Sequence, residues 1–132
     1  MISEPIFLTL DDALEIHADM IESYGGSAGV RDIPLLESAL AQPRATFGGE
    51  YLLPDIPLMA AAYLFSIAKN HPFIDGNKRA GAACAVIFLK ANGHELRTTR
   101  DEELAEITER IAASQATREE LDQFFHERAV EL

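Results

Sequence analysis

Apolar and polar positions alternate with a helical period along nearly the whole chain. The period predicts helices over residues 10–24, from Asp32 to 42, over 58–70, from Gly76 or Asn77 to 92, and two more that open at Thr99 and Thr117. Hydroxyl and carboxylate side chains stand where capping residues are expected before the first, second, fifth and sixth of these helices. The pattern therefore predicts an all-α fold of about six helices, in a single domain over residues 1–132.

The third and fourth predicted helices differ from the others because they are apolar on every side. A helix of this kind is normally buried, so we expect the two to form the centre of the fold, wrapped by amphipathic helices. The stretch from Pro43 to Pro57 lacks helical periodicity and holds several prolines and glycines. It predicts a long loop or a small flap, which is our candidate for docking a target protein by strand pairing. Residues 94–98 are expected to be briefly extended.

The charge balance restricts the class of ligand. The 132 residues include 11 lysines and arginines against 22 aspartates and glutamates, a formal net charge of −11. Such a surface repels nucleic acid and anionic lipid, so we expect neither as a partner. A phosphate-bearing ligand would need a local concentration of positive charge.

The cysteine count and the hydropathy of the chain argue against a disulfide and against a membrane-spanning segment. Cys84 is the only cysteine, which rules out a disulfide within the chain, and its apolar surroundings predict a buried thiol. The apolar stretches are too short to span a bilayer, and the N-terminus lacks the features of a signal peptide. We therefore expect a soluble, cytoplasmic protein.

The segment from His71 to Arg79 interrupts the two apolar helices with polar residues. His71 is a candidate general base, since an imidazole titrates near neutral pH. Asp75 is a candidate ligand for Mg²⁺, which prefers oxygen donors. Phe73 lies between them and is expected to anchor the segment in the core.

The second half of this segment predicts an anion site. Gly76, Asn77 and Lys78 begin a helix, where free N–H groups and the helix dipole attract anions. Lys78 and Arg79 add two full positive charges. The alternative is a polar turn with solvated charges. Cations at a helix N-terminus oppose the dipole, and this unfavourable placement favours the anion site.

His71-Pro72-Phe73-Ile74-Asp75-Gly76-Asn77-Lys78-Arg79 resembles the signature of the Fic/Doc superfamily. The Fic pattern is H-P-F-x-[DE]-G-N-G-R-x-x-R, from which this chain departs at Lys78 and Ala82. Both departures are similar to the Doc, or death-on-curing, branch, whose pattern is H-x-F-x-[DN]-[AG]-N-K-R. The segments 24–32, 35–40 and 88–94 also resemble Doc proteins, so the resemblance covers residues 7–97.

The resemblance implies a compact helical fold, ATP and Mg²⁺ as cofactors, and modification of a hydroxyl on a target protein. It implies a toxin that is silenced by an antitoxin partner and that phosphorylates a translation factor, such as an elongation factor. In these roles His71 would deprotonate a serine or threonine hydroxyl and Asp75 would hold Mg²⁺. Gly76 and Asn77 would cradle phosphate, while Lys78 and Arg79 would neutralise the transferring group.

Other functions stay open at this stage. Fic enzymes usually transfer AMP, so nucleotidyl transfer is the first alternative. Lys78 fills the space that glycine leaves open in Fic proteins, and we expect it to favour presentation of the γ-phosphate. A catalytically idle binding module is the second alternative, although the intact polar segment argues against it. A helical metallohydrolase is a remote option, because a second histidine close to His71 is missing.

Four further residues and one segment are weaker candidates for parts of a site. His17 falls on the apolar stripe of the first helix and is expected to be a hydrogen-bonded core histidine. His94 and His126 are expected to face solvent, and Arg31 is expected not to reach the site. The stretch 46–51 is the nearest match to the inhibitory helix of some Fic proteins, but its glycines argue against a helix there.

Overall fold

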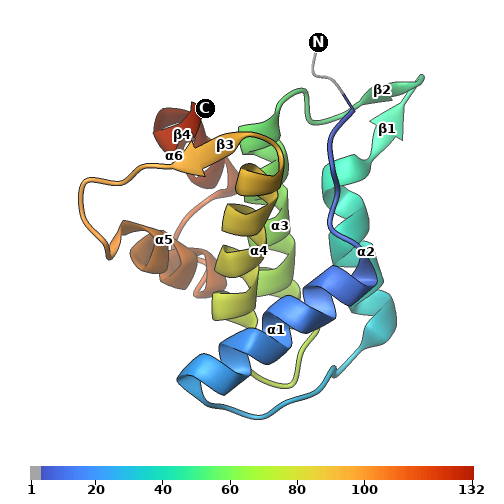
Figure 1. Ribbon diagram of the computed structural model, residues 1–132, viewed down its shortest axis with the longest axis vertical. Helices are drawn as coiled ribbons and strands as arrows, with labels where there is room; N and C mark the ends of the chain where they lie inside the picture. The colour runs from blue at the N-terminus through green and yellow to red at the C-terminus, as the bar shows by residue number, and fades with distance from the viewer. Residues whose placement is uncertain (1–3) are drawn as a thin grey trace.

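Helices make up most of the computed structural model, which describes residues 4–132 (Figure 1). Over these residues the elements are α1 (Leu10–Tyr24), α2 (Ile33–Ala41), the 3₁₀ turn η1 (Gln42–Arg44), β1 (Thr46–Phe47), β2 (Glu50–Tyr51), α3 (Ile56–Asn70), α4 (Asn77–Ala91), β3 (His94–Leu96), α5 (Glu103–Ala112), α6 (Arg118–Arg128) and β4 (Ala129–Glu131). The six α-helices of this part of the chain confirm the all-α prediction.

Helices α3 and α4 form the predicted buried pair at the centre of the fold. Ten of the 15 residues of α3 are buried, and the two helices run side by side in opposite directions (Figure 1). Gly81 of α4 lies directly against α3, where a Cβ would come within 3.2 Å of the Leu64 carbonyl oxygen. The absence of a side chain at Gly81 therefore permits the close approach of the two helices.

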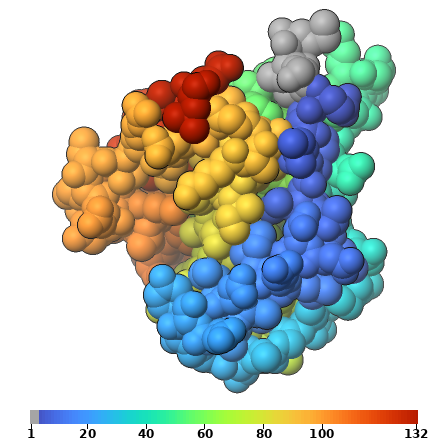
Figure 2. Space-filling model, in the orientation of Figure 1, coloured from blue at the N-terminus to red at the C-terminus, as the bar shows by residue number. Residues whose placement is uncertain are grey.

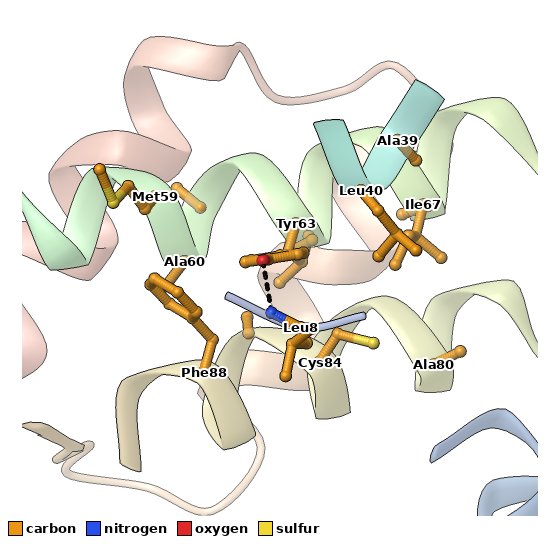
Figure 3. Close-up of a cluster of buried hydrophobic side chains, with 14 of the residues drawn as sticks. Leu8, Ala39, Leu40, Met59, Ala60, Tyr63, Ile67, Ala80, Cys84 and Phe88 are labelled. Carbon is orange, nitrogen blue, oxygen red and sulfur yellow. Dashed lines mark hydrogen bonds between the residues drawn. The ribbon is translucent and has the colours of Figure 1, made fainter. Parts of the chain in front are cut away.

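The core also closes around the N-terminal segment. The buried hydroxyl of Tyr63 accepts a hydrogen bond from the Leu8 N–H group at 3.0 Å (Figure 3). Burial raises the pKa of Tyr63 to about 12, so this hydroxyl stays neutral. Burial likewise raises the pKa of Cys84 to about 12, which confirms the prediction of a buried thiol.

The remaining helices wrap the central pair. Helix α1 packs across α4, while α2, η1, α5 and α6 pack against α3. Figure 2 shows the surface of α4 in yellow between the blue residues of α1 and the orange residues of the α5 region. Strands β3 and β4 pair in antiparallel register, from His94 opposite Glu131 to Leu96 opposite Ala129. This pairing ties the end of α6 to the end of α4.

The segment between α2 and α3 folds into the predicted small flap. Strands β1 and β2 form a hairpin in which Thr46 is opposite Tyr51 and Phe47 is opposite Glu50. The side chain of Phe47 is 81% exposed. The strands also exclude an inhibitory helix at 46–51, as the glycines predicted.

Two predicted helix starts are wrong. Helix α3 begins at Ile56 instead of 58, because Asp55 caps it by accepting the Leu58 N–H group at 3.0 Å. Helix α5 begins at Glu103 instead of just after Thr99. There the Glu103 carboxylate accepts hydrogen bonds from the N–H and hydroxyl groups of Thr99. The Thr99 side chain therefore does not cap the helix. Strand β4 was not predicted at all.

Within residues 4–132, no helix combines the length and the apolar composition that crossing a membrane requires.

Candidate active site

The polar segment of the sequence forms the loop between α3 and α4, at one end of the buried pair. His71 is the residue that ends α3, and it adopts a left-handed conformation with φ 51° and ψ 56°. Its N–H group donates to the Ile67 carbonyl at 3.2 Å and closes the last turn. His71 is exposed, so its imidazole is accessible from solvent.

Phe73 anchors the loop, as the sequence predicted. Its side chain is 1% exposed and stacks on the His17 ring with centroids 3.8 Å apart and planes 2° apart. The His17 Nε2 atom lies 2.8 Å from the Asp75 carbonyl oxygen. Because a carbonyl only accepts, Nε2 carries the proton and donates. His17 is thus the buried, hydrogen-bonded histidine that was predicted, and it holds the backbone of Asp75.

The Asn77 side chain also closes the loop. Its amide donates to the Phe73 carbonyl at 3.0 Å and its carbonyl accepts the Phe73 N–H at 2.9 Å, within a site that leaves Asn77 8% exposed. These two bonds engage the side chain inside the loop. A phosphate cradle at this position would therefore depend on the Asn77 backbone.

The Asp75 carboxylate is exposed and ionised. One oxygen accepts the Ser27 N–H at 3.1 Å and the other accepts the Gly76 N–H at 2.8 Å. These two bonds, the Ser27 bond first, lower the pKa of Asp75 below its ordinary value of 3.8. Gly26 makes room for the carboxylate, since a Cβ there would lie 2.8 Å from Asp75 Oδ2. The carboxylate is held in place with lone pairs free for a metal or a phosphate-bound water.

The start of α4 has no side-chain cap. Gly76 occupies the capping position with φ 74°, and the first backbone bond of the helix runs from the Ala80 N–H to the Gly76 carbonyl at 2.9 Å. Residues 77–79 lie between Gly76 and Ala80, and no described residue accepts a hydrogen bond from their backbone N–H groups. Free N–H groups at a helix start form an anion-binding site.

Two cations flank these N–H groups. Lys78 Nζ lies 2.9 Å from Glu109 Oε1 on α5, and both side chains are about half exposed or more. The Arg79 guanidinium lies over the Tyr24 ring, 4.7 Å from its centroid. Within residues 4–132, Arg79 makes no ion pair, so its charge is available to a ligand.

The loop and α5 enclose a cleft of about 760 Å³. All six candidate residues line it: His71, Asp75, Gly76, Asn77, Lys78 and Arg79. The structure therefore brings the whole predicted set into one cavity. The opposite wall comes from α5 and the turn before it, with Asp101, Leu104, Thr108 and Glu109.

Sequence reasoning missed this α5 wall and the reach of Arg31. Arg31 does not line the cleft, as expected, but its Nε donates to the His71 carbonyl at 2.8 Å and its Nη2 donates to the Asn70 carbonyl at 3.0 Å, so it contacts the backbone of a site residue. No local pattern pairs these residues, which are 40 positions apart. The sequence of α5 has the pattern of an ordinary amphipathic helix, which does not indicate that one of its faces lines a cleft.

The other two histidines lie outside the cleft. His126 Nε2 is 2.9 Å from Asp55 Oδ2 on the surface, as expected. His94 is only partly exposed, because its Nδ1 bonds to the Asn92 carbonyl at 2.9 Å beside the β3–β4 pairing. The expectation that His94 faces solvent is therefore met in part.

Known proteins share this sequence pattern. Residues 7–89 match the Fic/DOC family. The chain is similar to Toxin Doc of Mycolicibacterium smegmatis, with 44% identity over 84 residues that cover 64% of this chain and 65% of that protein. It is also similar to Protein kinase doc of Escherichia phage P1, with 31% identity over 98 residues, 74% of this chain and 75% of that protein. The chain thus spans slightly less than two thirds of the mycobacterial relative.

The family match covers more than half of the chain and includes the entire loop from His71 to Arg79. The helical fold around a central buried pair is consistent with it. This chain belongs to the Fic/DOC family.

Proposed function

We propose that this protein is a Doc-type toxin that transfers the γ-phosphate of ATP to a serine or threonine hydroxyl of a target protein. One observation supports this proposal most. His71, Asp75, Lys78 and Arg79 line a single cleft, at a helix start whose N–H groups are free within residues 4–132. The two relatives are named as a toxin and a protein kinase, which points to the same chemistry.

His71 is the proposed general base. It would take the proton of the target hydroxyl while that oxygen forms a bond to the γ-phosphorus. The bond between the γ-phosphorus and the bridging oxygen of ADP breaks, and ADP leaves with the electron pair. Lys78 and Arg79 would stabilise the negative charge on the transferring group, together with the N–H groups at the start of α4.

The chemistry of the site fits a magnesium nucleotide. Asp75 offers an ionised, exposed carboxylate, and its lowered pKa keeps it so at neutral pH. The described residues contain no cluster of three or more metal-binding side chains. Mg²⁺ commonly binds through one or two carboxylates plus the phosphates of its substrate, and in that role it neutralises phosphate charge. Asp75 would be its ligand from the protein.

Lys78 supports transfer of the γ-phosphate over transfer of AMP. Glycine at this position would leave the space between α4 and α5 open, whereas Lys78 extends across the cleft to Glu109 on α5. The lysine occupies part of that space and supplies a mobile charge. A nucleotide placed over it would present a different phosphate to His71 than it does in a Fic enzyme.

The biological setting is part of the same proposal. The toxin would act in the cytoplasm on a translation factor, such as an elongation factor, and an antitoxin protein would silence it. The exposed flap at β1 and β2 would dock the target.

A labelling assay tests the proposal. ATP labelled separately at the α- and γ-phosphates is added with the protein to a bacterial lysate. We compare wild type with His71→Ala, and with His126→Ala as a matched control on the surface. Label from the γ position alone, kept in the His126 variant and lost in the His71 variant by about 10²-fold or more, is the expected result.

Other outcomes would contradict it in distinct ways. Label from the α position would indicate AMP transfer instead. No label that depends on His71 would leave a protein-binding module that does no chemistry with ATP.

A further inference from the structure

The segment from Gly29 to Asp32, between α1 and α2, runs alongside the loop that joins α3 to α4. The Arg31 N–H donates to the Pro72 carbonyl at 2.8 Å, and the Ile74 N–H donates to the Gly29 carbonyl at 3.1 Å. Val30 and Phe73 form an isolated antiparallel bridge. This pairing fixes the backbone of Arg31 next to the end of α3.

His71 adopts a conformation that its own side chain disfavours. Its φ of 51° lies in the left-handed region, which glycine occupies most readily at the end of a helix. The following Pro72 disfavours the right-handed helical conformation for His71. The competing conformation is therefore the extended one, which would re-aim the imidazole.

The Arg31 side chain contacts the backbone on both sides of the His71 N–H group. Its Nε donates to the His71 carbonyl at 2.8 Å and its Nη2 to the Asn70 carbonyl at 3.0 Å. The direction of the His71 carbonyl depends on the ψ angle of His71, so rotation to the extended conformation would break the bond to Nε. The cation also lies at the C-terminal end of α3, where the helix dipole favours it.

We infer that Arg31 is a positioning residue that holds His71 in its left-handed conformation and so aims the imidazole into the cleft. The inference rests on the proposed role of His71 as the base. Arg31 does not line the cleft itself, so it acts through His71 and not on the nucleotide. Its planar fork reaches two neighbouring carbonyls at once, which a lysine ammonium does not match.

The test compares Arg31→Met and Arg31→Lys with the wild-type protein. Arg31 is exposed, so its loss leaves the core intact. Arg97→Met serves as the matched control, since Arg97 is also exposed, directly follows β3 and does not line the cleft. Two readouts are taken: phosphate transfer from ATP, and the NMR coupling between the amide and α protons of His71 together with its Cα shift.

We expect Arg31→Met to lower kcat about tenfold. Without Arg31, the left-handed conformation of His71 should become about tenfold less populated relative to the extended one. The KM for ATP should stay as in wild type, and Arg31→Lys should fall between. The His71 coupling should move towards the extended value in Arg31→Met and stay unchanged in Arg97→Met.

Wild-type kcat in Arg31→Met would overturn the inference, and so would a lowered kcat with an unchanged His71 coupling. If the wild-type protein itself transfers no phosphate, the proposed function fails. The NMR comparison then decides alone whether Arg31 sets the conformation of His71.

Discussion

The starts of α6 and α4 differ in what occupies their N–H groups. At α6, the Thr117 hydroxyl accepts the Glu120 N–H at 3.1 Å, and the Glu120 carboxylate accepts the Thr117 N–H at 3.1 Å. At α4, Gly76 offers no side chain, and the first turn carries Lys78 and Arg79. Acidic residues in a first turn complement the helix dipole, whereas cations there oppose it.

The comparison separates two uses of one structural feature. A helix start that is capped and acidic is stabilised by its own residues. A helix start that is uncapped and cationic gains stability when an anion binds. Substitutions at the start of α4 should therefore change activity, whereas substitutions at the start of α6 should change stability.

The largest effect is expected at α4. Arg79→Ala should lower phosphate transfer about 10³-fold, because an arginine on the transferring group typically contributes at least that much. Its free energy of unfolding should change little. Loss of the contact with Tyr24 costs ~0.5–1 kcal/mol, while removal of a cation from the helix N-terminus returns a similar amount. Initial rates and urea unfolding measure the two quantities.

Thr117→Ala is the opposite variant. It removes the α6 cap and should cost ~1 kcal/mol of stability with no change in transfer. A stability loss in Arg79→Ala as large as this, or an activity loss in Thr117→Ala, would break the comparison.

The second prediction concerns pH and the start of α5. The Glu103 carboxylate, 8% exposed, is bonded by the Thr99 hydroxyl, the Arg100 N–H and the Arg128 guanidinium. These bonds, the Thr99 hydroxyl first, lower the pKa of Glu103 from 4.5 to about 2. A lowered pKa means that the carboxylate stabilises the fold fully above pH 4.5 and loses that effect as the pH falls towards about 2.

Glu103→Gln should therefore be less stable at neutral pH and should show a flatter dependence of unfolding free energy on pH between these two values. Urea unfolding over a series of pH values measures the slope. The neighbouring Glu102→Gln makes the same charge change on an exposed side chain and should keep the wild-type slope. An unchanged slope in Glu103→Gln would show that other carboxylates govern acid unfolding.

The smallest effect is expected at the ion pair that joins Lys78, in the first turn of α4, to Glu109 of α5. Under the proposed function, the nucleotide would compete with Glu109 for the lysine. Exposed pairs of this kind contribute ~0–1 kcal/mol, so Glu109→Gln should bind ATP up to about fivefold more tightly. Calorimetric titration should show the gain shrinking as salt is added.

Glu95→Gln is the matched control, because Glu95 pairs with Arg97 at an exposed site outside the cleft. It should leave ATP binding as in wild type. Weaker binding in Glu109→Gln would mean that Glu109 orients Lys78 for the nucleotide instead of competing for it.

Local signals in the sequence predicted much of this architecture. Thr9 and Thr117 marked the starts of α1 and α6 correctly, because a capping box depends only on residues three positions apart. The apolar composition of α3 and α4 predicted the buried pair. The loop between them placed all six candidate residues in one cleft, since they are adjacent in the chain.

Long-range contacts account for what the sequence left out. The Glu103 carboxylate at the start of α5 accepts a bond from Arg128, 25 positions away. The hold of Arg31 on His71 spans 40 positions, and the wall that Glu109 adds lies 31 positions beyond Lys78. Contacts between residues so far apart depend on how the helices pack, and the hydrophobic periodicity of the sequence does not predict that packing.

Gly81 gives the core a direct influence on the chemistry. The proposed base, His71, lies at the end of α3, and Lys78 and Arg79 lie at the beginning of α4, so the distance between the two helix axes also sets the distance between these groups. A side chain at Gly81 would press on the Leu64 carbonyl and move the axes apart. A side chain at Gly81, which does not itself line the cleft, should therefore lower the proposed phosphate transfer in a chain that keeps His71, Lys78 and Arg79.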